Sequence, residues 1–123
     1  MPSNIFIYVE SIELIDPTNS LLTEMPVRDE EGGKTYGFMT PYKETSGGFT
    51  VSLKAVVKPS NATIKEVYFY SEKSDTTEYS VETSPDDKTI VNITFYKSGV
   101  YAQGRAQSTD GKQTKVGFVV YAY

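Results

Sequence analysis

The acids are the first residues of this chain to consider for chemistry, because the sequence contains neither histidine nor cysteine. Without histidine it lacks the commonest general base and zinc ligand, and without cysteine it can form neither a disulfide nor a thiolate metal site. Two acidic clusters remain, Asp29-Glu30-Glu31 and Asp86-Asp87. Carboxylates in these positions could bind calcium or serve glycoside hydrolysis. Neither cluster has EF-hand spacing, so we expect solvated turns, with no catalytic residue, metal site or cofactor.

The length, charge and hydropathy of the chain limit the kinds of structure that could hold these acidic groups. A chain of 123 residues fits a single domain, 1–123, with one core. Its formal charge of −4 is spread along the chain and does not suggest a nucleic-acid partner. The first residues lack the pattern of a secretory signal, and no window reaches the ~20 apolar residues that span a bilayer. We therefore expect no membrane insertion.

Apolar residues recur at every second position, which is the period of a strand with one buried face. The segments 49–57, 77–83 and 89–96 show this alternation clearly. In the first of them the predicted inward residues are Phe49, Val51, Leu53, Ala55 and Val57. With turn signals about every ten residues, the pattern predicts an all-β, antiparallel sandwich of about seven strands.

The sequence also predicts strands at the two ends of the chain. Near the start, Ile5, Ile7 and Val9, followed by Ile12 and Leu14, predict one or two strand pieces with a register break at residues 10–11. At the other end, the tight-turn dipeptide Asp110-Gly111 predicts a hairpin between strands at about 99–108 and 113–122.

A long insert, residues 16–48, interrupts this rhythm after the first strand. Connections of this length are usually functional loops or contain a hairpin of their own, and we expect a short strand at about 34–40. Three aromatic residues of the insert, Tyr36, Phe38 and Tyr42, have no obvious reason to lie in a loop. They are interface candidates, or they pack the insert onto the domain.

The stretch "LKAVVKPSNATIKEVYFYSEKSD" resembles the bacterial immunoglobulin-like group 2 domain, found in intimin- and invasin-type adhesins and in bacteriophage virion proteins. "VESIEL" is similar to the first strand of that family, and "SGVYAQGRAQSTDGKQTKVGFVVYA" to its closing strands. The resemblance covers about residues 9–15 and 49–122, and the 16–48 insert departs from it. It implies an immunoglobulin-like β-sandwich.

Four residues carry the expected fold. Phe69 takes the place of the core tryptophan in the family, as a large ring filling the space between the sheets. Pro59 ends strand pairing and Asn61 satisfies turn backbone groups with its side chain. Tyr101 either forms a tyrosine corner or points outward, with Val100, Ala102, Gly104 and Ala106 as the inward face.

The many tyrosines are open to two interpretations. They could form a stacking surface for sugars or for a partner protein, or they could reflect the general preference of sheets for aromatic residues. The resemblance implies a non-enzymatic structural or adhesive module. We expect a free-standing domain, and a free-standing domain of this kind favours a virion protein that contacts a capsid or tail protein, itself, or the host surface. The alternative is a bacterial cell-surface adhesin that binds host protein or glycan.

Overall fold

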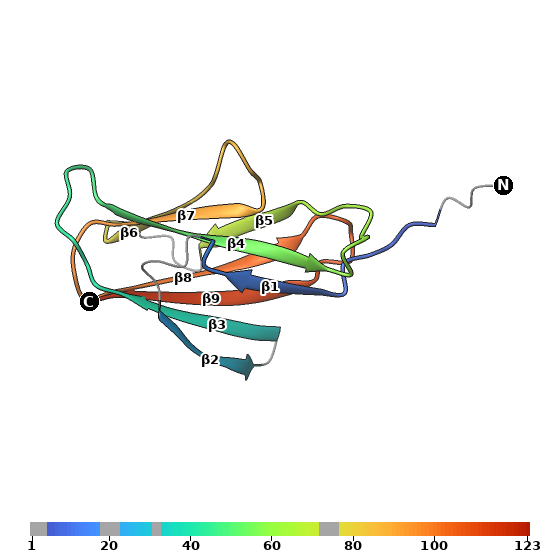
Figure 1. Cartoon of the computed structure of the whole chain (residues 1–123), viewed down its shortest axis with the longest axis horizontal. Helices are drawn as coiled ribbons and strands as arrows, with labels where there is room; N and C mark the ends of the chain where they lie inside the picture. The colour runs from blue at the N-terminus through green and yellow to red at the C-terminus, as the bar shows by residue number, and fades with distance from the viewer. Residues whose placement is uncertain (1–4, 18–22, 31–32, 72–76) are drawn as a thin grey trace.

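A computed structural model describes residues 5–17, 23–30, 33–71 and 77–123 of the protein, and for residues 23–30 it describes the backbone alone. These residues form nine strands and no helix (Figure 1). The described residues therefore include no helix that could cross a membrane. The strands are β1 (Ser11–Ile15), β2 (Thr23–Glu30), β3 (Gly33–Thr40), β4 (Phe49–Lys58), β5 (Val67–Ser71), β6 (Tyr79–Thr83), β7 (Ile90–Phe95), β8 (Val100–Ser108) and β9 (Lys115–Ala122).

The strands form two sheets that face each other. Sheet A has the order β1-β4-β7-β6, and sheet B has the order β2-β3-β9-β8-β5. In Figure 1 the described N-terminal segment and the C-terminus lie at opposite ends of the long axis. The prediction of an all-β sandwich is therefore confirmed at the level of two facing sheets.

The core fills the space between the sheets with alternate residues of the strands. All five predicted inward residues of β4 are buried, as are Val91, Ile93 and Phe95 of β7. Phe69 is also buried, but it is not the single ring that closes the core. Six aromatic residues share the interior: Phe38, Phe49, Phe69, Tyr79, Phe95 and Phe118.

Three features differ from the sequence-based expectation. The count of about seven strands is too low, because the insert contributes both β2 and β3. The sandwich is not purely antiparallel, since β3 pairs in parallel with β9. Residues 5–10 form no strand, although Val9 is fully buried and Glu10 N donates to Lys58 O at 2.7 Å.

The insert is part of the sandwich because β3 lies inside sheet B, between β2 and β9. The strand predicted at about 34–40 is confirmed. The predicted hairpin at the end of the chain is confirmed too, since β8 and β9 pair antiparallel from Val100 opposite Ala122 to Gln107 opposite Lys115. The 16–48 insert therefore extends one sheet of the sandwich.

Thr40, at the end of β3, has a fully buried hydroxyl with no hydrogen-bond partner within the described part of the chain. An unsatisfied buried hydroxyl costs stability, and valine has nearly the same shape without that group. We expect Thr40→Val to raise the free energy of unfolding by about 1 kcal/mol. Urea denaturation of both proteins measures this difference, and a destabilised variant would show that the hydroxyl has a partner in solution.

Candidate functional site

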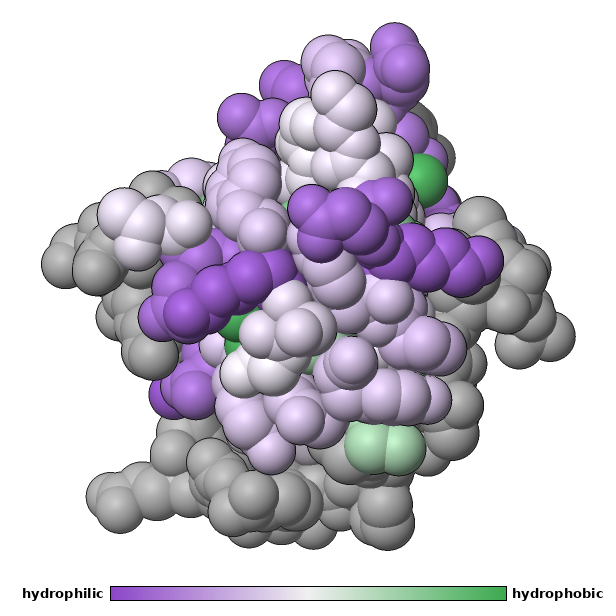
Figure 2. All heavy atoms as spheres, turned by 90° about the vertical axis from the view of Figure 1, so that its left-hand side faces the viewer, coloured by the Kyte–Doolittle hydropathy of each residue, from purple (hydrophilic) through white to green (hydrophobic). Residues whose placement is uncertain are grey.

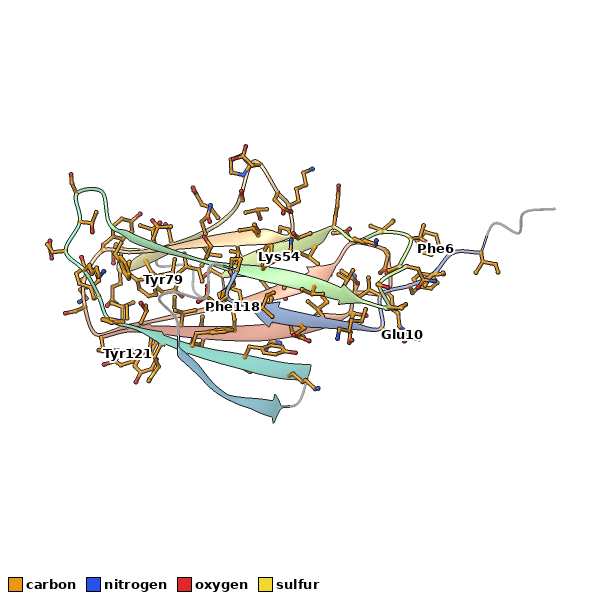
Figure 3. All side chains as sticks on the ribbon, viewed as in Figure 1. Phe6, Glu10, Lys54, Tyr79, Phe118 and Tyr121 are labelled. Atoms are coloured by element: carbon orange, nitrogen blue, oxygen red, sulfur yellow. The ribbon has the colours of Figure 1, made fainter. Side chains whose placement is uncertain are left out.

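The strongest candidate site is the outward side of sheet B, which we call the tyrosine face. It carries five tyrosines: Tyr68 and Tyr70 on β5, Tyr101 on β8, Tyr121 on β9 and Tyr123 just after β9. On β8 the neighbours Val100 and Ala102 are buried, so the alternation of the strand turns Tyr101 outward. Figure 3 shows Tyr121 on the side of β9 away from sheet A, whereas Phe118 and Tyr79 lie between the sheets.

The tyrosines form two stacked groups on this face. Tyr101 lies opposite Tyr121 in the β8/β9 register, and their ring centroids are 4.2 Å apart with planes at 17°. Tyr123 extends this group, with its ring 6.0 Å from that of Tyr121. Tyr68 and Tyr70 form the second group, with centroids 5.5 Å apart. Tyr68, Tyr101 and Tyr123 are each more than half exposed, at 58%, 53% and 53%.

Polar and planar side chains lie between the two groups. Gln103 and Arg105 follow Tyr101 on the outward side of β8, and Arg105 lies opposite Tyr70 in the register. Four residues along a strand span about 13 Å, so Tyr101 is that far along β8 from the row of Tyr70. A face of rings, amides and a guanidinium offers contact area, hydrogen bonds and cation contacts together.

The outward side of sheet A is different, because its polar side chains bond to one another across the strands. Thr50 and Thr94 share a hydrogen bond of 2.8 Å between their hydroxyls, and Ser52 Oγ donates to Asn92 Oδ1 at 2.7 Å. A partner would have to break these bonds to replace them. The tyrosine face is therefore the better contact surface of the two.

Figure 2 shows the end of the sandwich where the C-terminus lies, at one edge of the tyrosine face. The described surface there is hydrophilic or intermediate, with only small hydrophobic areas. A contact at this end would therefore use amphipathic and polar groups, as tyrosine provides, and not an aliphatic patch.

A groove of about 390 Å³ lies between β1, an edge strand of sheet A, and strands β3 and β9 of sheet B. Its acids, Glu10 and Glu13, face three lysines, Lys34, Lys58 and Lys115. Glu13 pairs with Lys58 at 3.5 Å. Because its charges are largely compensated, this groove is a weaker candidate than the tyrosine face.

The acidic clusters considered for calcium differ in how far they can be described. The side chains of Asp29-Glu30-Glu31 lie outside the described residues. Asp87 is engaged by the protein itself: Thr89 donates from its backbone N at 2.9 Å and its hydroxyl at 2.6 Å, and Lys54 lies 3.4 Å away. Among the side chains that the structure describes, no group of three or more acids could hold a metal ion.

A third carboxylate, Asp110, has a structural role in the turn between β8 and β9. Its Oδ2 accepts from Val9 N at 2.7 Å, and its Oδ1 accepts from Ser108 Oγ at 2.9 Å and Lys112 N at 3.0 Å. Burial disfavours the charged form, but the hydrogen bonds from Val9, Lys112 and Ser108 outweigh it and lower the pKa of Asp110. The carboxylate thus anchors the N-terminal segment to the end of sheet B.

This arrangement predicts acid sensitivity. Because the folded-state pKa is below the unfolded one, the stabilisation is present above about pH 5 and is lost as the pH falls below about 4. Asp110→Asn should lower the free energy of unfolding by about 1–3 kcal/mol at neutral pH. Denaturation at pH 7 and pH 3 measures the gap between wild type and variant, which should narrow at pH 3. An equal gap at both values would contradict this role.

The three predicted interface residues of the insert pack against the domain. Phe38 is 1% exposed, so its prediction as an interface residue is wrong and the insert-packing alternative applies. Tyr36 is half-buried in the groove, and its hydroxyl donates to Ile12 O at 3.4 Å. The half-buried Tyr42 places its ring edge-on to Phe49, with centroids 6.0 Å apart. The structure therefore does not bring these three residues together on an open surface.

The residues predicted to carry the fold have mixed outcomes. Phe69 is 6% exposed, as a core role requires. Pro59 directly follows β4, and its carbonyl accepts from Ala62 N at 3.0 Å. Asn61 is exposed and, within the described residues, makes no side-chain hydrogen bond, so the turn relies on the backbone instead. Tyr101 is not a tyrosine corner, because its ring is on the outer face.

The abundance of tyrosine is plain in the sequence, but the five residues of the tyrosine face were not distinguished there from the other tyrosines. The signal that could have found it is parity within the closing hairpin. Val116, Phe118 and Val120 alternate along the last strand and are buried, which places Tyr121 on the other side.

A scan against protein-family models finds no match, and neither a search of curated proteins nor one of solved structures finds a similar protein.

Proposed function

We propose that this chain is a non-enzymatic, immunoglobulin-like module that works by surface contact through its tyrosine face. The observation that carries the proposal is the contrast between the two outer faces. Sheet A presents side chains that bond to one another, whereas sheet B presents stacked, half-exposed tyrosines beside Gln103 and Arg105. Tyrosine and arginine are enriched at protein contact sites, because they offer large areas at a small entropic cost.

The strand order supports the immunoglobulin-like assignment. An immunoglobulin constant-type domain has strands A, B, E and D in one sheet and C, F and G in the other. Taking β1, β4 and β5 as A, B and C, and β6 to β9 as D to G, gives sheet A the order A-B-E-D and places C, F and G together in sheet B. The β2/β3 hairpin is then an addition beside strand G. This order agrees with the resemblance to the bacterial group 2 domain.

The resemblance also suggests where such a module would work. A virion capsid or tail would display many copies, so a weak contact of each copy with the particle or host surface would become strong by avidity. The alternative is a domain of a bacterial surface adhesin that binds host protein or glycan. The neighbouring genes discriminate the two, since capsid or tail genes support the first and repeated domains with an anchor support the second.

A glycan ligand is the second candidate, and the exposed row of rings favours it. Sugars pack their C–H faces on aromatic rings while amides and guanidinium groups bond to their hydroxyls. Gln103 and Arg105 lie between the two tyrosine groups and supply such donors. Labelled protein on a glycan array tests this candidate.

The proposed contact surface makes a direct prediction for Tyr101→Ser. The variant removes a half-exposed ring without touching the core, so it should fold normally and weaken binding to particles or cell envelopes of its source by about tenfold. Tyr96→Ser is the matched control, because Tyr96 is 46% exposed but follows β7 in sheet A. Binding of labelled domain measures the effect. Equal binding by wild type and the Tyr101 variant would reject the tyrosine face as the contact site.

A further inference from the structure

The N-terminal segment, residues 5–8, is an exposed apolar arm. Ile5 is 71% exposed, Phe6 42% and Tyr8 48%, and the rings of Phe6 and Tyr8 lie 4.8 Å apart. No residue of the segment is charged. Isolated exposed apolar residues are ordinary, but three within four residues concentrate apolar surface in one short segment, and exposed apolar surface of this kind marks contact sites.

The arm is held in place at its base. Ile7 N donates to Thr63 Oγ1 at 2.7 Å, and Thr63 N donates to Ile7 O at 2.9 Å. Val9 is fixed by Asp110 Oδ2 and by the hydroxyl of Thr114, which donates to Val9 O at 2.8 Å. The backbone is therefore tied to the domain while the side chains of Ile5, Phe6 and Tyr8 stay exposed. A segment held in this way loses less entropy on binding than a free tail would.

The arm and the larger group of tyrosines lie at opposite ends of the molecule. Figure 3 places Phe6 at one end of the long axis and Tyr121 at the other, and in Figure 1 the arm points away from the sandwich along that axis. Two copies arranged end to end can therefore bring the arm of one to the group formed by Tyr101, Tyr121 and Tyr123 of the other. We call this group the tyrosine cluster.

The two surfaces match in chemistry. The arm offers an aliphatic side chain and two rings, and the cluster offers three rings beside Met39, which lies opposite Tyr121 in the β3/β9 register. None of these groups carries a charge, so their contact would leave no ion to desolvate. Aromatic rings also gain from contacts with one another beyond the area that they bury.

We propose that the arm of one copy packs on the tyrosine cluster of the next copy, so that the chain associates head to tail. This inference rests on the proposed role of the tyrosine face as a contact surface, and it names the partner as a second copy of the chain. Because the two contacting surfaces differ and lie at opposite ends of the molecule, the contact is heterologous and can repeat into a row.

The contact should be weak for each pair. An arm of four residues buries far less than the roughly 1,200–2,000 Å² of a stable interface, so association should appear only at high protein concentration. Copies displayed side by side on a surface would meet at a much higher effective concentration, and the same contact would then order them into rows.

Sedimentation velocity over about a hundredfold range of protein concentration tests the proposal. The highest concentration should be about millimolar, which is the effective concentration that modules linked to one another reach. The arm variant carries Phe6→Ser and Tyr8→Ser, and the cluster variant carries Tyr101→Ser. The wild type should increase in mass with concentration, and each variant alone should associate at least about tenfold more weakly. An equal mixture of the variants should form a pair and nothing larger, since only one intact arm and one intact cluster can meet.

Tyr96→Ser is the matched control, because Tyr96 is 46% exposed but follows β7 in sheet A, outside the tyrosine face. It should associate like the wild type. A wild type that stays monomeric at every concentration, or an arm variant that associates like the wild type, would overturn the inference. If either result occurs while Tyr101→Ser still loses binding to particles or envelopes, the tyrosine face remains a contact surface and only the head-to-tail partner is wrong.

Discussion

Replacing Phe38 by alanine should lower the free energy of unfolding by about 3–5 kcal/mol, a large share of the stability of a domain of this size. Phe38 comes from the insert, yet it is 1% exposed and belongs to the same core cluster as Phe118 and Val120. Alanine would leave a cavity in that cluster. Chemical denaturation measures the loss directly.

A matched substitution on the same strand separates core packing from a general weakness of β3. Met39 follows Phe38 but lies on the outward side of sheet B, opposite Tyr121. Met39→Ala should therefore cost less than about 1 kcal/mol. If Phe38→Ala cost no more than Met39→Ala, the insert would be a peripheral loop and the position of β3 in sheet B would be wrong.

Gly104→Ala should be the second most damaging substitution, with a cost of about 3 kcal/mol. Gly104 is on the inward side of β8, and an added Cβ would meet the ring of Phe118 and come within 2.7 Å of the carbonyl oxygen of Tyr70. A side chain can move aside, but the backbone of the paired strand β5 cannot move without breaking the ladder. Thermal and urea unfolding both measure the cost.

Gly117→Ala provides the comparison. Gly117 lies opposite Arg105 in the β8/β9 register, on the outward side, and its nearest atom to an added Cβ is Thr35 Oγ1 at 3.1 Å. A small side-chain shift relieves that contact, and alanine is better than glycine in a strand. We expect a change below about 1 kcal/mol. Similar costs at both glycines would show that Phe118 does not pack over Gly104.

The parts of the fold that the sequence predicts well are those where alternation alone decides. Val91, Ile93 and Phe95 must lie on the same face of any strand, because alternate side chains share a face. Since only one face of the strand is buried, these apolar residues must be on it. β2 escaped prediction because "TEMPVRDE" does not alternate, contains Pro26 and shifts register between Met25 and Arg28. Such irregular, charged strands are common at sheet edges, where fewer packing contacts constrain them.

Features that depend on distant partners could not be predicted in the same way. Nothing in the local pattern of β3 says that it pairs in parallel with β9, since the choice of partner depends on the whole core. The sequence allowed Tyr101 either to form a tyrosine corner or to point outward. The ring of Phe118 occupies the space over Gly104, so the Gly104 side of β8 faces the core and Tyr101 points outward. The exposed arm was predicted to be a strand piece because its apolar residues alternate. Alternation does not reveal whether a neighbouring strand is present to pair with the segment.

The most direct test of the account is the chemical reactivity of each tyrosine at low and high protein concentration. Nitration followed by mass spectrometry resolves the rings one by one. In dilute solution Tyr101 and Tyr123 should react and the buried Tyr79 should not, whereas in concentrated solution Tyr101 and Tyr123 should become protected and Tyr68 should stay reactive. Protection of Tyr101 in the dilute monomer, or reactivity that does not change with concentration, would contradict the tyrosine face as a contact surface between copies.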